Sequence, residues 1–169
     1  MDQEKADKEP PVNDKRTTAT GKPMPSREAI EALAGHRFRG GRYRVAHWEN
    51  ALLTRCTGAE LLADAMVHPI ALFHLPITGS GTSIAEMFAL GQAESDLSIM
   101  IESYDWEFFH ALREETDYRV RGQVNSAERC LDDAGNHYDR IQFCFEVFAA
   151  QELLSARSTI TWHYTRNML

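Results

Sequence analysis

The stretch SIAEMFALGQAESDLSIMIESYDWEFF, residues 83–109, changes from a helical to an extended pattern of apolar side chains. Ser83 and Glu86 have the spacing of a capping box, which predicts that a helix begins here and runs to Glu94. Four positions fall on one helical face: Ile84, Met87, Phe88 and Gly91. Since Ala85 and Ala89 widen this apolar face, the pattern indicates a helix wrapped by other structure.

From residue 97 onward the apolar residues alternate with period two, which predicts four strands over 97–109, 116–130, 137–148 and 156–166. In the first strand the apolar parity changes near Ser103, which indicates a bulge. The segment DDAGN, residues 132–136, predicts a hairpin turn between the second and third of these strands. Consecutive strands with such short connections predict an antiparallel sheet.

The chain before residue 83 is less regular. Residues 1–25 hold four prolines and many charges, so we expect a disordered tail. Ser26 and Gly35 have the positions of caps for a helix over 27–34, and residues 42–48 suggest a strand. Short helices are expected over 49–56 and 60–66. This order predicts one α+β domain over 26–169, with a sheet curled around a central helix.

Composition restricts the function classes. The chain has 169 residues, 43% of them hydrophobic, and a formal net charge of −7, which argues against nucleic acid as the main partner. A few local arginines could still bind the phosphates of an anionic ligand, although a charged sheet face explains such residues equally well: Arg113, Arg119, Arg121, Arg157 and Arg166. No apolar run is long enough for a membrane helix, and the charged N-terminus lacks a signal-peptide pattern. The odd, widely spaced Cys56, Cys130 and Cys144 are typical of free thiols, so we expect a cytoplasmic protein.

The order of elements resembles the hot-dog fold and, within it, the MaoC-like acyl-CoA dehydratases and hydratases. The resemblance covers residues 42–166 and is clearest in YDWEFFHALREETDYRVRGQVNSAERC, residues 104–130, and in the closing ARSTITWHYTR, residues 156–166. The proline and glycine that the family has in its turn are absent from residues 111–116. The resemblance implies a long central helix wrapped by a curved antiparallel sheet, pairing with a second hot-dog chain, and a coenzyme A or carrier-protein thioester as substrate.

The catalytic signature of that family is an Asp and a His after a Ser/Thr-Gly pair. Thr57-Gly58 resembles the pair, but Ala59 takes the place of the Asp. Asp64 and His68 form a shifted version, and His74 follows six residues later. The resemblance therefore implies either a site rebuilt from Asp64, His68 and His74 or a chain that has lost the chemistry. An ordinary explanation exists for each: a solvated carboxylate, and loop or core histidines bonded to backbone.

Hydration of an enoyl thioester needs an acid–base pair, donors for the thioester oxygen and an apolar pocket. Gly79, Gly81 and Thr82 are candidate substrate-binding residues, because glycines before a helix let its free N–H groups approach an oxygen. A tight loop into a capped helix explains them equally well. In some hot-dog thioesterases a carboxylate on the central helix does the chemistry, which makes Glu86 a candidate, although its role in the capping box is the preferred interpretation.

Three functions follow from these residues: a MaoC-like hydratase or dehydratase, a non-catalytic hot-dog subunit that pairs with an active chain, and a thioesterase using Glu86. Glu49 and Asn50 form a candidate buried polar pair near the pocket, and a strand-end turn explains them as well. No metal or redox cofactor is expected, because the sequence has no tight His/Cys/Asp ligand cluster and no GxGxxG motif. The expected partners are an acyl-CoA-type molecule and a second hot-dog chain, without nucleic acid or membrane.

Overall fold

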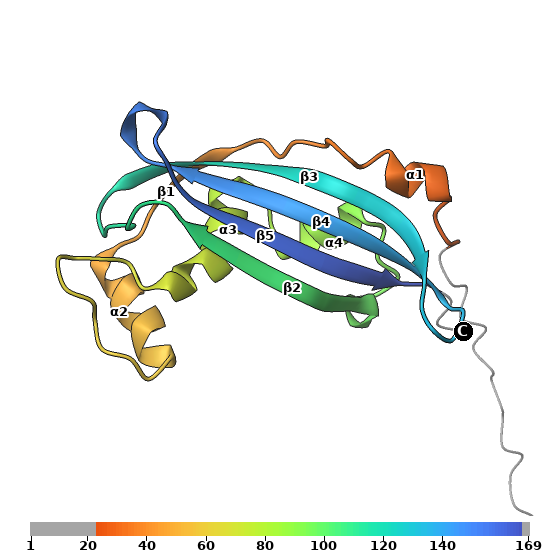
Figure 1. The fold of residues 1–169 in the computed structure, drawn as a ribbon, viewed down its shortest axis with the longest axis horizontal. Helices are drawn as coiled ribbons and strands as arrows, with labels where there is room; N and C mark the ends of the chain where they lie inside the picture. The colour runs from red at the N-terminus through yellow and green to blue at the C-terminus, as the bar shows by residue number, and fades with distance from the viewer. Residues whose placement is uncertain (1–22, 167–169) are drawn as a thin grey trace, which may run out of the picture.

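One antiparallel sheet dominates the structure, a computed structural model that describes residues 23–166. Its strands are β1 (Gly41–Arg44), β2 (Ile99–Phe108), β3 (Asp117–Leu131), β4 (His137–Phe148) and β5 (Leu154–Thr165). They lie side by side in the order β1-β3-β4-β5-β2, so that β1 and β2 form the edges (Figure 1). The four strands predicted from the alternating pattern are thereby confirmed. The predicted tail over 1–25 falls almost wholly outside the described residues, and so do the last three residues of the predicted domain.

Two features of the sheet that the sequence predicts, a bulge in β2 and a turn between β3 and β4, are present in the structure. The register between β2 and β5 shifts between Ile101 and Ser103, which confirms the predicted bulge. The β3–β4 turn is held by the Asp132 carboxylate, which accepts hydrogen bonds from the backbone N–H of Ala134 at 2.9 Å and of Asn136 at 2.8 Å. Gly135 has a φ of +83°, a conformation that glycine adopts without steric cost. The predicted hairpin is therefore confirmed.

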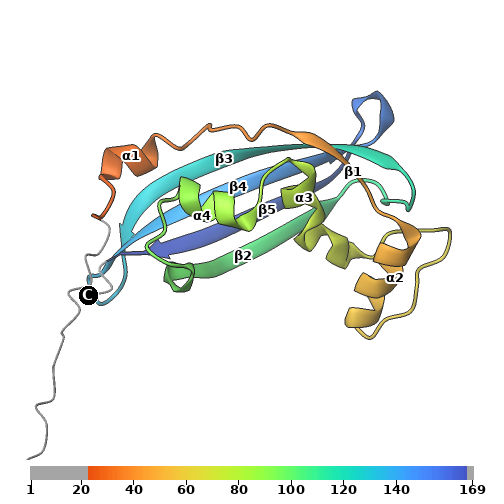
Figure 2. The ribbon, with the colours of Figure 1, turned by 180° about the vertical axis from the view of Figure 1, so that it is seen from behind.

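The core lies between the concave face of the sheet and the short helices that cross it (Figure 2). Alternate residues of the long strands point inward and are completely buried, as Val124, Phe143 and Ile160 illustrate. From the helical side, Ile77 and Met87 pack into the same cluster. Burial of this apolar surface is the main stabilising contribution to the fold.

Six short helical segments precede β2, and a seventh lies between β4 and β5. The helices are α1 (Arg27–Glu31), α2 (His47–Cys56), η1 (Pro69–Phe73), α3 (Leu75–Gly79) and α4 (Ile84–Leu90), followed by η2 (Asp96–Ser98) and η3 (Ala150–Glu152). The Ser26 hydroxyl accepts a hydrogen bond from the backbone N–H of Ala29, which confirms the predicted cap, although α1 is shorter than the predicted 27–34.

The central helix is shorter than the sequence pattern predicts. It begins as expected, because the Ser83 hydroxyl accepts a hydrogen bond from the backbone N–H of Glu86 at 3.2 Å. It ends at Leu90 rather than Glu94, since Gly91 packs directly against the Tyr164 ring and Gln92 has a φ of +51°. The helical layer over the sheet is thus built from α3 and α4, separated by residues 80–83.

Between residues 42 and 66, the predicted first strand is present but shorter than expected, and one predicted helix was wrong. The predicted strand 42–48 ends at Arg44, and α2 already begins at His47. The predicted helix 60–66 is a loop, in which Asp64 and Ala65 have φ values of +57° and +53°. Tertiary contacts override the local pattern there, because the loop backbone is bonded to Arg113 and bridges to it at Met66.

A buried ion-pair cluster joins the sheet to the end of α4. The Asp139 carboxylate accepts hydrogen bonds from Arg129 at 2.7 and 3.0 Å and from Arg166 at 2.7 Å. Arg166 also donates to the backbone oxygens of Gly91 at 2.6 Å and Gln92 at 2.7 Å. Asp139 and Arg166 are both completely buried, so this cluster fixes the position of the helical layer over the sheet.

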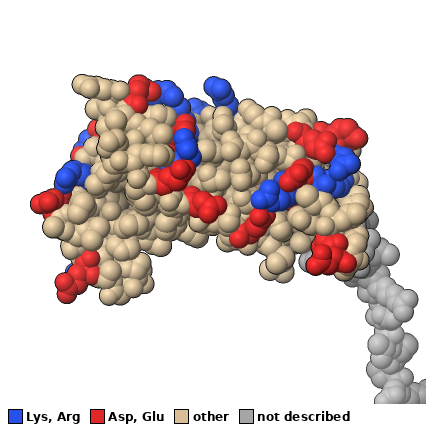
Figure 3. All heavy atoms as spheres, viewed as in Figure 1, with Lys and Arg blue, Asp and Glu red and all other residues tan. Residues whose placement is uncertain are grey.

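Charged side chains of both signs alternate on the outer surface of the sheet, with uncharged surface between them (Figure 3). Arg157 bridges Glu107 on β2 and Glu146 on β4, both at 3.1 Å. Arg140 binds Glu102 across the sheet at 2.7 Å. Within residues 23–166 there is no helix with the length and apolar character needed to cross a membrane.

Candidate functional site

A histidine, a glutamate and a tyrosine meet beside the start of α3. The Glu49 carboxylate oxygen Oε1 lies 2.9 Å from Nε2 of His74 and accepts a hydrogen bond of 2.5 Å from the hydroxyl of Tyr43. The rings of Tyr43 and His74 meet edge to face, with centroids 6.2 Å apart. The Glu49 side chain is 14% exposed and that of His74 is 35% exposed, so the carboxylate lies behind the imidazole.

Local structure explains why these three residues meet. Tyr43 lies on β1, and α2 begins four residues later at His47, which places Glu49 in the first turn of the helix. His74 lies at the junction of η1 and α3, where Pro76 allows a new helix to start. Burial, together with the bond to Glu49, raises the pKa of the Tyr43 phenol. Tyr43 therefore remains a hydrogen-bond donor to Glu49 at neutral and moderately alkaline pH.

Asn50, the neighbour of Glu49, binds the loop 57–68 and Glu114. Its side chain donates to the backbone oxygen of Met66 at 3.1 Å and to the Glu114 carboxylate at 2.6 Å, and it accepts from the backbone N–H of His68 at 2.9 Å. The Asn50 bond, supported by His47, holds the pKa of Glu114 below its ordinary value. Asn50 thus ties the loop 57–68 to α2, which fixes the entry into η1.

A pocket of about 470 Å³ lies directly beside His74. Its wall is largely apolar, with His74, Thr78, Thr82 and Ser83 as the polar groups. The lining residues are Phe73, His74, Ile77, Thr78, Thr82, Ser83, Ile84 and Ala85. A pocket of this size with a few polar groups is typical of a small-molecule site.

The structure does not bring Asp64 and His68 together into an acid–base pair. Asp64 is exposed in the loop 57–68, and its backbone oxygen accepts a bond from Arg113. The Nδ1 atom of His68 accepts a hydrogen bond from the backbone N–H of Ile70 at 3.2 Å, which caps η1. The helical turn that would have placed both residues on one face is absent from this part of the described chain. Of the three predicted residues, His74 alone borders the pocket.

The candidate substrate-binding residues have three different environments. Gly79 is buried, and a methyl group on its Cα would lie 2.7 Å from the Val120 side chain. Gly81 has a φ of +72° and lies against the Arg39 guanidinium. Thr82 lines the pocket, and its hydroxyl donates to the Glu86 carboxylate at 3.2 Å.

Glu86 lies on the exposed side of α4 and is bonded by two hydroxyls. Thr82 and Ser83 each donate to its Oε2 atom at 3.2 Å. The preferred interpretation, a role in capping α4, agrees with these contacts in part: Ser83 caps Glu86, but the Glu86 carboxylate takes the Ser83 hydroxyl rather than its backbone N–H. Glu86 is not among the residues that line the pocket.

Sequence reasoning did not assign Tyr43 to the site and considered Glu49 only as half of a polar pair with Asn50. The available signal was a strand followed at once by a helix whose first turn carries an acidic residue. That signal does not identify the partner of Glu49, because His74 lies 25 residues further along the chain. Among residues 23–166, no three His, Cys, Asp or Glu side chains are grouped so that they could hold a metal ion.

No family model matches the sequence, and no curated protein sequence matches it. Among solved structures, the chain is similar to the ChsH1-ChsH2 complex from Mycobacterium tuberculosis, with a TM-score of 0.61 and 10% identity over 84% of this chain and 97% of that one. The C-terminally truncated HadBC complex, a 3R-hydroxyacyl-ACP dehydratase from the same organism, gives a TM-score of 0.59 and 13% identity over 78% and 96%. The monoamine oxidase regulatory protein from Archaeoglobus fulgius gives 0.57 and 9% over 79% and 91%.

These similarities extend over nearly the whole length of each solved chain, at identities that establish the fold alone. The five-stranded antiparallel sheet, with α3 and α4 against its concave face, agrees with them. The sequence resemblance was therefore correct about architecture, and the chain has the hot-dog fold.

Proposed function

We propose that this chain hydrates or dehydrates an acyl thioester, and that His74 is its acid–base residue. The observation that carries the proposal is the His74 imidazole, held by the largely buried Glu49 carboxylate at 2.9 Å on the border of a mostly apolar pocket. Histidine is suited to proton transfer near neutral pH. A carboxylate behind the ring orients it and stabilises its protonated form.

In the proposed chemistry, the His74 imidazole first accepts a proton and then donates it. A proton on Nε2 directed at Glu49 leaves Nδ1 free to accept the proton of a water molecule. The water oxygen bonds to C3 of a 2-enoyl thioester, the C2–C3 double bond becomes single, and the imidazolium returns its proton to C2. Dehydration is the reverse of these steps. The Tyr43 hydroxyl holds the same Glu49 oxygen and thereby restricts the carboxylate.

The pocket supplies the environment for the acyl chain. Phe73, Ile77 and Ile84 provide apolar walls that an alkyl group could contact. Thr82 and Ser83 line the same pocket just before α4, and their hydroxyl groups donate to Glu86. Rotated away from Glu86, these hydroxyls would donate to the thioester oxygen, which keeps Thr82 in its predicted role.

A second hot-dog chain is part of the proposal. Large apolar side chains are exposed near the pocket and along the free edge of β2: Phe73, Ile84, Leu97, Met100 and Ile101. In the described sheet β2 pairs with β5 alone, so its other edge offers unpaired backbone groups. A second copy that pairs along β2 would cover both the edge and these side chains. Light scattering would then give a dimer, and I101D would give a monomer.

The test is the loss of enoyl absorbance when the purified protein is incubated with crotonyl-CoA or longer 2-enoyl-CoA esters. We expect H74Q and E49Q to lower kcat/KM by at least ~100-fold, because each removes a part of the acid–base pair. H110Q, which replaces an exposed histidine away from Glu49, is the matched control. Activity that survives H74Q but is lost in H68Q would contradict the assignment and favour the Asp64–His68 alternative.

A non-catalytic subunit is the second candidate. It is favoured by Ala59 at the position of the expected acid and by the separation of Asp64 from His68. In that case the isolated chain is inert and hydration appears only after a second hot-dog chain is added, with H74Q as active as the wild type. Release of free thiol that is lost in E86Q would instead support the thioesterase alternative.

A further inference from the structure

Five arginines gather where β1 meets β3, on a chain whose net charge is −7. They are Arg37, Arg39, Arg42, Arg119 and Arg121. Three adjoining hollows of about 290 to 300 Å³ share these side chains along the strand edge. The middle hollow is lined by four of the arginines, three further uncharged residues and no acidic residue.

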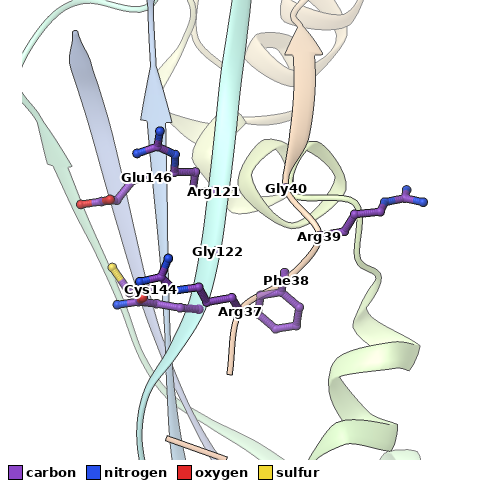
Figure 4. A pocket seen from close by; sticks show the side chains of 9 residues that line it. Arg37, Phe38, Arg39, Gly40, Arg121, Gly122, Cys144 and Glu146 are labelled. Atoms are coloured by element: carbon purple, nitrogen blue, oxygen red, sulfur yellow. The ribbon is translucent and has the colours of Figure 1, made fainter. Parts of the chain in front are cut away.

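Strand register places three of these arginines together. Arg42 lies opposite Arg119 in the β1–β3 pair, and Arg121 follows two residues later on the same face of β3. Val120 between them is completely buried on the opposite, inner face. Arg39 points away from Arg121, toward the helical side of the sheet (Figure 4).

The arginine cluster has an unusual electrostatic environment. Burial lowers the pKa of Arg119, and repulsion from Arg121 and Arg42 lowers it further. The Nε atom of Arg119 is buried and has no hydrogen-bond partner among the described residues. A bound anion would reduce the repulsion and offer acceptors to these donors.

One carboxylate already lies at the position that such an anion would take. The Glu152 carboxylate contacts both Arg119 and Arg121, the latter at 2.8 Å. It comes from the β4–β5 connection, where Gln151 and Glu152 have φ values of +58° and +61°. Two successive non-glycine residues in this region carry backbone strain, and the Glu152 side chain is exposed enough to move away.

The cluster is adjacent to the pocket through residues 39–41. Gly41 packs so closely on α3 that a methyl group there would lie 2.6 Å from the backbone oxygen of Gly79. The Arg39 guanidinium lies against Gly81, and Thr82, the next residue, lines the pocket beside His74. This contact leaves the pocket on the helical side and the arginine cluster on the outer side, so an elongated ligand that occupies both must pass around the β1 edge.

We propose that Arg42, Arg119 and Arg121 bind the phosphate group of the thioester's carrier moiety, and that Glu152 occupies this site when the phosphate is absent. The inference rests on the proposed function for the identity of the ligand. Guanidinium groups match phosphate geometry with paired hydrogen bonds. Coenzyme A and carrier-bound phosphopantetheine both contain a phosphate ester, and coenzyme A adds a phosphorylated adenosine.

Titration calorimetry with 3′,5′-ADP and, separately, with phosphopantetheine tests the site and distinguishes the two sources. We expect R42Q and R121Q each to weaken binding of the preferred probe by about tenfold. E152Q removes the internal competitor and is expected to tighten binding by roughly threefold or more. R157Q is the matched control, because Arg157 is bonded to Glu107 and Glu146 instead.

Two calorimetric results would overturn this site: failure of both probes to bind wild type and E152Q, or equal losses of affinity in R157Q and R121Q. Thermal unfolding of each variant shows that a loss of binding does not come from a loss of fold. Normal binding of 3′,5′-ADP without any hydration of enoyl-CoA would contradict the proposed function and leave the phosphate site intact. Hydration that is unaffected by R42Q and R121Q at low substrate would contradict the phosphate site alone.

Discussion

Two carboxylates in this molecule each bind two side chains, but one lies in a buried ion-pair cluster and the other holds a histidine beside a pocket. Asp139 lies between the guanidinium groups of Arg129 and Arg166 and is completely buried. Glu49 lies between the phenol of Tyr43 and the imidazole of His74, and of these three residues His74 borders a pocket. The first has two permanently charged partners and cannot exchange protons with them. The second is bonded to an imidazole, the kind of side chain that most often transfers protons, so this pair suits the proposed acid–base chemistry.

The two carboxylates also lie in parts of the fold that differ in how firmly they are held. At the Asp139 end, long paired strands and the Arg166 bonds to Gly91 and Gln92 leave little freedom. At the Glu49 end, short segments such as η1 and α3 are joined by loops. Functional groups are commonly held on loops that a rigid scaffold positions, and the proposed site follows that rule.

The largest stability effect is expected for D139N. Removing this charge leaves the buried Arg166 guanidinium without its counter-ion, which costs about 3–5 kcal/mol. Urea unfolding followed by circular dichroism measures the change. A loss below about 1 kcal/mol would show that the cluster does not anchor α4.

In contrast to D139N, H74Q is expected to have a large effect on activity and a small effect on stability. Activity falls by roughly 100-fold or more, while the free energy of unfolding changes by about 1 kcal/mol or less, since His74 is partly exposed. Enoyl-CoA kinetics and urea unfolding on the same preparation give both values. If H74Q destabilised the protein as strongly as D139N, the contrast between the two carboxylates would fail.

Y43F removes the hydroxyl group that donates to Glu49 and preserves the packing of the ring against His74. The Glu49 oxygen loses one donor, for which we expect a cost of about 1 kcal/mol in stability and a smaller fall in kcat than for H74Q. Full activity in Y43F would mean that His74 alone positions the carboxylate.

S83A tests how much α4 depends on its cap. The Ser83 hydroxyl accepts the backbone N–H of Glu86, and loss of such a cap costs about 1 kcal/mol. Thermal unfolding against wild type measures the effect, with S26A, which removes the cap of α1, as a cap variant outside the pocket. An unchanged midpoint would show that packing of Met87 holds the helix without the cap.

The smallest effect is expected for the surface carboxylate of Glu102, whose contribution to the free energy of unfolding depends on pH. Hydrogen bonds from Arg140 and then His163 lower the pKa of Glu102 from its ordinary 4.5 to about 2. Because the folded chain binds this proton more weakly than the unfolded chain, the stabilisation is complete above pH 4.5 and is lost as the pH falls toward 2. E102Q should therefore narrow the difference in unfolding free energy between pH 5 and pH 2.5. An identical difference in both proteins would show that the pair contributes nothing.

The sheet was predictable from the sequence, because alternating burial over β3, β4 and β5 leaves a period of two in the residues themselves. The loop 57–68 was not, since Asn50 and Arg113 determine its conformation from distant positions. For the same reason the sequence identified His74 as a candidate but could not pair it with Glu49. The end of α4 depends on Tyr164 and Arg166, which lie more than 70 residues away.

The position of β5 in the sheet has a consequence for synthesis and folding. Although β5 comes last in chain order among the described strands, it lies between β4 and β2 and is the strand on which β2 pairs. During synthesis on the ribosome, β2 therefore has no strand of this sheet to pair with until residues 154–165 have been made. Such long-range pairing slows folding and leaves apolar strand surface open to chaperones or to aggregation in the meantime.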